Sequence, residues 1–97
     1  MTISLIATLK VKEGNMEKTI EVLKEIVPKI KAAEPGLLEY TPHTVKGRKE
    51  KNTIIFYEKY KDKEALNIHS ANLGKSLANL LPLLEPGMDV ITCFEIL

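Results

Sequence analysis

Apolar and polar residues alternate in four segments of the chain, which is the pattern of strands that bury one face. In the first segment every odd position from Ile3 to Val11 is apolar, and Ile6 alone interrupts the polar positions between them. The segment at positions 53–60 alternates most clearly. We predict strands at Thr2–Val11, Leu37–Val45, Thr53–Tyr60 and Met88–Ile96.

The second predicted strand has two distinctive features. Pro42 has no backbone N–H to donate, so it restricts this strand to the edge of a sheet or to a bulge. We place Leu38 and Tyr40 on one face of it. A charged stretch, Lys46–Asn52, follows, and Gly47 is its expected turn residue.

Two further segments repeat apolar residues at steps of three and four, the spacing of a helix with one buried face. The first spans Met16–Ile30 and stops before the EPG stretch at positions 34–36. We expect Pro28 to kink this helix or to end its first part. The second runs from Lys63 to about Leu84, with Gly74 or Pro82 as its candidate break.

The predicted order is strand, helix, strand, strand, helix, strand. Right-handed crossovers join these elements into an α+β, ferredoxin-like β-α-β-β-α-β fold with a four-stranded antiparallel sheet. The length of 97 residues suits one domain, spanning residues 1–97. Both helices would then cover the same face of the sheet.

The opposite face of this sheet should be polar if the protein works as a monomer. Instead, the third strand has Ile54 and Phe56 on one face and Ile55 and Tyr57 on the other. The last strand and Ile6 add further apolar side chains. Each large apolar side chain left in water forgoes about 1.5–3 kcal/mol. We therefore predict a homodimer that packs its sheets face to face.

Composition and charge exclude several classes of protein. The chain is 44% hydrophobic and 28% charged, as in folded globular proteins, and its net charge of +1 does not favour nucleic-acid binding. No apolar run approaches the roughly 18 residues that a membrane helix needs, and the first residues do not resemble a secretion signal. With these features and a single cysteine, Cys93, we expect a cytoplasmic protein without a membrane partner.

Few residues are candidates for chemistry, and common nucleotide, zinc and redox motifs are missing. With one cysteine and two histidines, we expect no metal site. His69 lies one helical turn from Leu66 and from Leu73, so it faces inwards. It is either a buried histidine bonded to a strand carbonyl or a base in a pocket.

Glu58 lies in the middle of a strand on the same face as Phe56 and Tyr60. A carboxylate in that position needs a partner. The partner is either a cation across the dimer interface or, in a functional site, His69 or a ligand. Tyr40 and Tyr60 combine an apolar ring with a polar tip, and core packing is the default role for both.

Three segments together resemble the antibiotic biosynthesis monooxygenase family of dimeric α+β barrels. EPGLLEY at 34–40 is similar to the family's E-P-G-x-x-x-Y turn, FYEKYKD at 56–62 to its aromatic-Y-E-x-W-x-D strand end, and EALNIH at 64–69 to its A-L-x-x-H helix start. Tyr60 stands where tryptophan is usual, and Gly74 stands where many members have a second histidine. Haem-degrading relatives need a tryptophan in the pocket and a histidine later in the second helix, so the lack of any tryptophan and of a histidine after His69 disfavours haem degradation.

The resemblance implies a dimeric barrel, a pocket between sheet and helices, and oxygenation of quinols or phenols without a cofactor. His69 would be the proton acceptor and Glu58 its orienting partner, while Tyr40, Tyr60, Phe56 and Leu73 would contact a small aromatic substrate. Two alternatives remain open. One is a non-catalytic dimer that binds or senses a small apolar ligand, and the other is an isomerase that transfers protons on a small metabolite.

Overall fold

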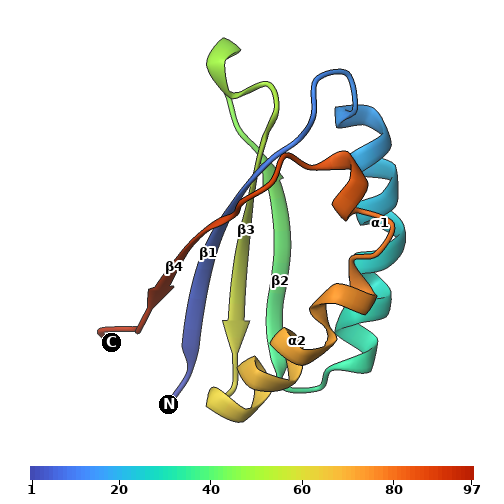
Figure 1. Cartoon of the computed structure of the whole chain (residues 1–97). Helices are drawn as coiled ribbons and strands as arrows, with labels where there is room; N and C mark the ends of the chain where they lie inside the picture. The colour runs from blue at the N-terminus through green and yellow to red at the C-terminus, as the bar shows by residue number, and fades with distance from the viewer.

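The computed structural model describes all 97 residues. The helices and strands follow the predicted order and form one sheet with both helices packed on the same face (Figure 1). The fold is therefore ferredoxin-like α+β, as predicted from the sequence. The elements are β1 (Ile3–Lys10), α1 (Met16–Ala33), β2 (Leu37–Thr44), β3 (Thr53–Tyr60), α2 (Lys63–Ser76) and β4 (Asp89–Cys93), with short 3₁₀ turns at Arg48–Glu50 and Leu81–Leu83.

The strand order in the sheet is β2-β3-β1-β4, and every neighbouring pair is antiparallel. The two most regular strands, β1 and β3, therefore lie in the centre. Their alternating apolar residues supply the core, with Leu5, Ala7 and Leu9 facing Ile54 and Phe56. Pro42 lies on the edge strand β2, where the missing backbone donor is tolerated.

A bulge in β2 changes one predicted face. The pairing with β3 shifts between Leu37 and Glu39, so that Leu37 and Tyr40 are buried while Leu38 is 45% exposed. The expectation that Leu38 and Tyr40 share a face was wrong, because a bulge inserts one extra residue and reverses the alternation beyond it. The extra residue allows both Leu37 and Tyr40 to reach the core.

Both helices also differ from the expectation. Helix α1 continues through Pro28, whose exposed position spares the core from the single lost hydrogen bond. Helix α2 ends at Ser76 rather than near Leu84, and the chain continues through 3₁₀-type bonds such as Leu80 N–H to Leu77 O at 2.9 Å. These turns still bury Leu77, Leu80 and Leu84, which explains why the apolar spacing suggested a longer helix.

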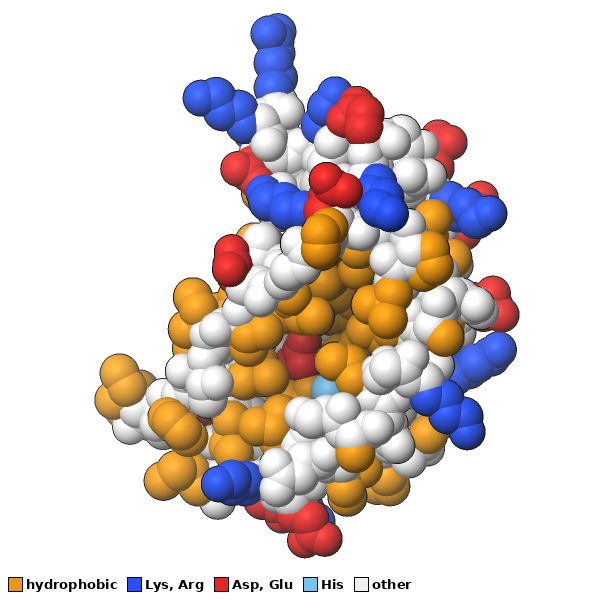
Figure 2. Space-filling view, in the orientation of Figure 1, with side chains coloured by type: hydrophobic (Ala, Val, Ile, Leu, Met, Phe, Trp, Pro, Cys, Tyr) orange, Lys and Arg blue, Asp and Glu red, His pale blue; other side chains and the backbone are white.

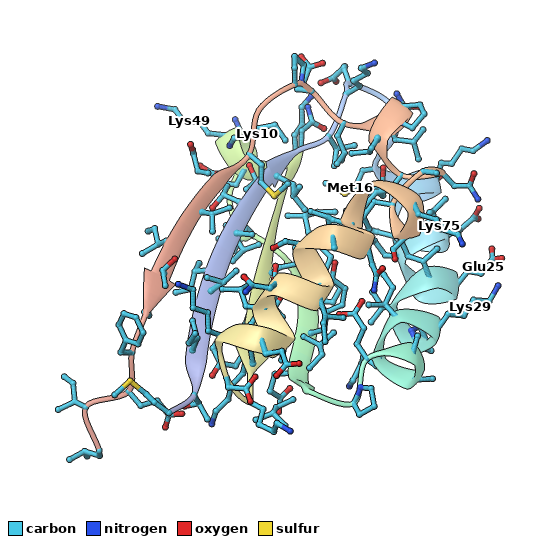
Figure 3. All side chains as sticks on the ribbon, turned by 60° about the horizontal axis from the view of Figure 1, so that its bottom comes forward. Lys10, Met16, Glu25, Lys29, Lys49 and Lys75 are labelled. Carbon is cyan, nitrogen blue, oxygen red and sulfur yellow. The ribbon has the colours of Figure 1, made fainter.

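Strand β4 is shorter than predicted because its partner ends. Cys93 pairs with Ser4, near the start of β1, and the residues that follow extend away from the sheet (Figure 1). Lys29 and Glu25 lie on the outer side of α1, where they form an ion pair (Figure 3). Neither helix combines the length and the apolar character required to cross a bilayer.

Candidate active site

Helix α2 is held at its start by two contacts that set the position of His69. Asp62 caps the helix by accepting a hydrogen bond from the Ala65 N–H at 2.9 Å. Ala65 also packs directly against Gly36, where an added Cβ would lie only 2.6 Å from the Ala65 Cβ. The first turn of α2 therefore rests on the turn between α1 and β2. His69 follows Ala65 by one helical turn and faces the sheet.

This close packing brings His69 to Glu34, the residue that follows α1. The His69 Nδ1 and Glu34 Oε1 atoms lie 2.9 Å apart, and only 5% of each side chain is exposed. A carboxylate can only accept, so with Glu34 ionised Nδ1 carries the proton and donates. In the neutral ring Nε2 is then the acceptor, available to take a proton from another group.

Glu58 lies on the other side of the imidazole. Its Oε1 atom is 3.9 Å from His69 Nε2 and accepts a hydrogen bond from the Tyr60 hydroxyl at 2.5 Å. Burial raises the pKa of the Glu58 carboxyl above its usual range. This effect of burial is larger than the lowering of the pKa by the Tyr60 hydrogen bond and by the charge of His69. Burial also raises the pKa of the Tyr40 and Tyr60 phenols, so both phenols keep their protons.

Aromatic rings surround the imidazole and fix its plane. Tyr40 meets His69 edge-on at a centroid distance of 5.1 Å, and Tyr60 lies 5.4 Å away in a tilted arrangement. Phe56 packs against Tyr40 at 4.8 Å. The imidazole is therefore fixed both by a hydrogen bond and by packing, which suits a group that must present one nitrogen in a constant direction.

A cavity of about 190 Å³ opens between α2 and the sheet, beside this cluster. Figure 2 shows the hollow, walled by hydrophobic side chains with an acidic and a histidine side chain at its floor. Polar groups are few, and most of the wall is apolar. Its lining residues are Leu5, Ala7, Leu9, Tyr40, Phe56, Glu58, Leu66, His69, Ser70, Leu73, Leu77, Met88 and Val90.

The structure brings together most of the residues predicted from the sequence. His69, Glu58, Tyr40, Phe56 and Leu73 all line the cavity. Tyr60, predicted to contact substrate, is fully buried and absent from the cavity wall. Its hydroxyl bonds Glu58 instead, so its place is behind the carboxyl group.

Glu34 was not among the site residues predicted from the sequence. Its position before Pro35 and Gly36 identified it as part of a helix stop, yet it provides the hydrogen bond to Nδ1 that was expected from Glu58. The alternative expectation for His69, a bond to a strand carbonyl, is not what the structure contains either. The signal in the sequence was the glutamate at the start of the EPGLLEY motif, because proline and glycine can end a helix without a glutamate before them.

A larger hollow, of about 520 Å³, lies between α1 and the end of β2. Its polar side chains include Lys24, His43 and Thr44, all of which are exposed to solvent. His43 places Nδ1 3.3 Å from the Ile55 carbonyl oxygen and has no carboxylate partner. Because no buried titratable group faces this hollow, the smaller cavity beside His69 is the candidate active site.

The fold and the site define a class of small α+β domains with a histidine–carboxylate pair beneath the sheet. Residues 2–73 match the model of the antibiotic biosynthesis monooxygenase family. This match covers well over half of the chain, and the chain belongs to that family. No curated protein sequence matches the chain significantly.

Solved structures share the fold over nearly the whole chain. A candidate antibiotic biosynthesis monooxygenase from Caulobacter crescentus is 24% identical, with a TM-score of 0.82 over 98% of this chain and 90% of its own. A protein from Shewanella oneidensis is 26% identical, with a TM-score of 0.74 over 95% and 88%. A protein from Pseudomonas aeruginosa is 22% identical, with a TM-score of 0.77 over 99% and 95%.

Proposed function

We propose that this protein is a cofactor-independent monooxygenase acting on a small, aromatic, quinol-like substrate. The observation that carries the proposal is the buried His69, bonded to Glu34 through Nδ1, at the wall of an apolar cavity. A histidine oriented in this way is suited to general-base catalysis near neutral pH. Membership of the monooxygenase family supports the choice of oxygen chemistry.

The cavity suits a single ring. An apolar cavity of about 150 Å³ holds one benzene molecule. The space beside His69 is about 190 Å³, and the rings of Tyr40 and Phe56 form part of its wall. A hydroquinone ring can stack against such rings while its hydroxyl group meets the polar floor formed by Glu58 and His69.

In the proposed reaction His69 Nε2 takes the proton of a ring hydroxyl. The imidazolium that forms is stabilised by the Glu34 carboxylate 2.9 Å from Nδ1. Removal of the proton leaves an electron-rich anion in an apolar cavity, where solvation by water is limited. The Tyr60–Glu58 hydrogen bond holds the second carboxyl group in place beside the ring.

The substrate itself then reduces molecular oxygen. The quinol supplies the four electrons that reduce O₂, and two of its hydrogen atoms leave in the water. One oxygen atom enters the ring and the other leaves as water, so that a hydroquinone and O₂ give a hydroxyquinone and H₂O. The chain's own residues bind and orient the ring, exclude water and hold the proton on Nε2 during the transfer.

We also propose that the protein works as a homodimer joined through its open sheet face. Tyr57, Ile6 and Ile91 are paired across β3, β1 and β4, and they form an apolar row on the face opposite the helices. Their exposed fractions are 37%, 38% and 61%. A second sheet packed at about 10 Å would cover this row. The apolar residues after β4, including Phe94 and Ile96, are also exposed and would gain from the same contact.

Light scattering after size exclusion tests the dimer. We expect twice the 10.9 kDa chain mass at micromolar concentration. In Ile91→Glu the mass should fall to that of one chain, because a charge would be buried at the interface. Ile68→Glu, on the outer side of α2, is a control and should remain dimeric. A wild-type protein of single-chain mass would contradict the proposal.

Oxygen uptake with a panel of hydroquinones tests the activity. His69→Ala should lower kcat about 10²-fold or more, the usual contribution of a general base. The exposed His43→Ala is the matched control and should retain wild-type activity. Absence of uptake across the panel, or an unaffected His69→Ala variant, would contradict an oxygenase.

Melting temperatures and product analysis with the same hydroquinones distinguish the two alternatives. A hydroquinone that raises the melting temperature without being consumed would favour a binding or sensing protein. A product formed without oxygen consumption would favour an isomerase, which could use the same base. The proposed oxygenase requires oxygen and quinol to disappear in equal amounts.

A further inference from the structure

A second hollow, of about 470 Å³, adjoins the cavity beside His69. The two hollows share Leu9 and Met88 as wall residues. None of the other three hollows has a lining residue in common with the His69 cavity. A substituent that leaves the ring cavity therefore has one neighbouring hollow to enter.

The walls of this second hollow are mainly apolar. Leu84 and Leu81 both line it; Leu84 is buried and Leu81 is 48% exposed. Its charged residues, Lys12 and Glu85, are exposed to solvent. Because no buried polar group awaits a partner, the hollow favours an apolar occupant with no requirement for a hydrogen bond.

Backbone hydrogen bonds hold one wall of this second hollow in place, whereas the side chain of Met88, which lines both hollows, can change its conformation. The Lys12 N–H donates to the Leu83 carbonyl at 2.8 Å, and the Glu85 N–H donates to the Lys10 carbonyl at 2.7 Å. These bonds tie the segment after α2 to the end of β1. At the junction Met88 is 40% exposed, and its unbranched side chain can change rotamer to let a substituent pass.

We infer that the substrate is a one-ring quinol with an apolar side chain, and that this side chain lies in the hollow beyond Met88. The inference rests on the proposed function and specifies its substrate class. The ring cavity has little room beyond a single ring, so added apolar atoms must lie elsewhere. Leu81 is then a specificity-determining residue that contacts the side chain and not the reacting ring.

A series of 2-alkylhydroquinones, with methyl, propyl and hexyl substituents, tests the inference through kcat/KM for oxygen uptake. Burial of a methylene raises kcat/KM about fourfold if complete and about twofold if half complete. We expect a gain in this range for each added methylene in the wild type. In Leu81→Asp the gain should disappear, whereas Leu81→Phe, which keeps an apolar wall, should retain it.

Leu38→Asp is the matched control, because Leu38 is a similarly exposed leucine on the far edge of the sheet and should retain the gain. Oxidation of methylhydroquinone with no gain for longer chains would overturn the inference and leave the proposed function intact. A gain that persists in Leu81→Asp would also overturn it, since the side chain would then bind elsewhere. If no member consumes oxygen, the proposed function and the inference fail together.

Discussion

Replacement of Glu34 by glutamine tests the part of the site that the structure defines most sharply. Glu34 and His69 are both buried, and their hydrogen bond is 2.9 Å long. Glutamine has nearly the same shape, and its amide oxygen can still accept from Nδ1–H. The substitution therefore removes the negative charge while keeping a hydrogen bond and the packing around it.

The expected effect follows from the type of bond that is lost. A hydrogen bond to a charged group contributes about 1.5–3 kcal/mol, and a neutral one contributes about 0.5–1.5 kcal/mol. The imidazolium formed during proton transfer should therefore lose about 1–1.5 kcal/mol of stabilisation in Glu34→Gln. Since about 1.4 kcal/mol corresponds to a factor of ten, kcat should fall about tenfold.

Steady-state oxygen uptake on a single-ring hydroquinone measures this change. Glu39→Gln, which alters an exposed carboxylate on β2, should keep the wild-type kcat. A melting temperature within about 8 °C of the wild type would show that the variant is folded. A folded Glu34→Gln protein with an unchanged kcat would refute the role of Glu34 in stabilising the imidazolium.

Two further predictions concern stability. Burial raises the pKa of Glu58 in the folded state above its usual 4.5, so the folded protein binds this proton more tightly than the unfolded chain does. The resulting stabilisation is full below about pH 4.5 and is lost as the pH rises through the folded pKa. The difference between the melting temperatures of the wild type and of Glu58→Gln should therefore change in favour of the wild type as the pH falls from 7 towards 4.5. A difference that stays constant over this range would contradict the prediction. Gly36→Ala should destabilise the protein by about 1–3 kcal/mol in chemical denaturation, because the new Cβ overlaps that of Ala65. Adding Ala65→Gly should restore part of the loss, and independent effects of the two changes would count against the contact.

The regular part of the fold could be predicted from the sequence because period-two and helical spacings report which face is buried. The central strands β1 and β3 follow their alternation closely. The bulge at Leu38 could not be predicted, since either register is compatible with the local sequence and the choice depends on pairing with β3. The end of α2 was misplaced because leucines at helical spacing also suit the buried turns that follow Ser76.

Part of the candidate site could also be predicted from the spacing of apolar residues, which shows which face of each element is buried. His69 and Glu58 were recognisable because each is a polar residue on an apolar face. Glu34 stands outside any periodic pattern, and its partner is 35 positions away. The EPGLLEY motif marks the residue, but its contact with His69 becomes evident only from the packing of α2 on Gly36. Tyr60 was assigned to the substrate because the sequence indicates its face but not the direction of its hydroxyl group.

The tautomer of His69 tests the central claim most directly. Long-range ¹H–¹⁵N correlation spectra of the imidazole, recorded at a pH at which the ring is neutral, distinguish the two nitrogens. The bond to Glu34 predicts a proton on Nδ1 and an unprotonated Nε2 on the side of Glu58, which lines the cavity. A proton on Nε2 instead would contradict the account, because the ring would then have no acceptor with which to take a proton from a substrate in the cavity.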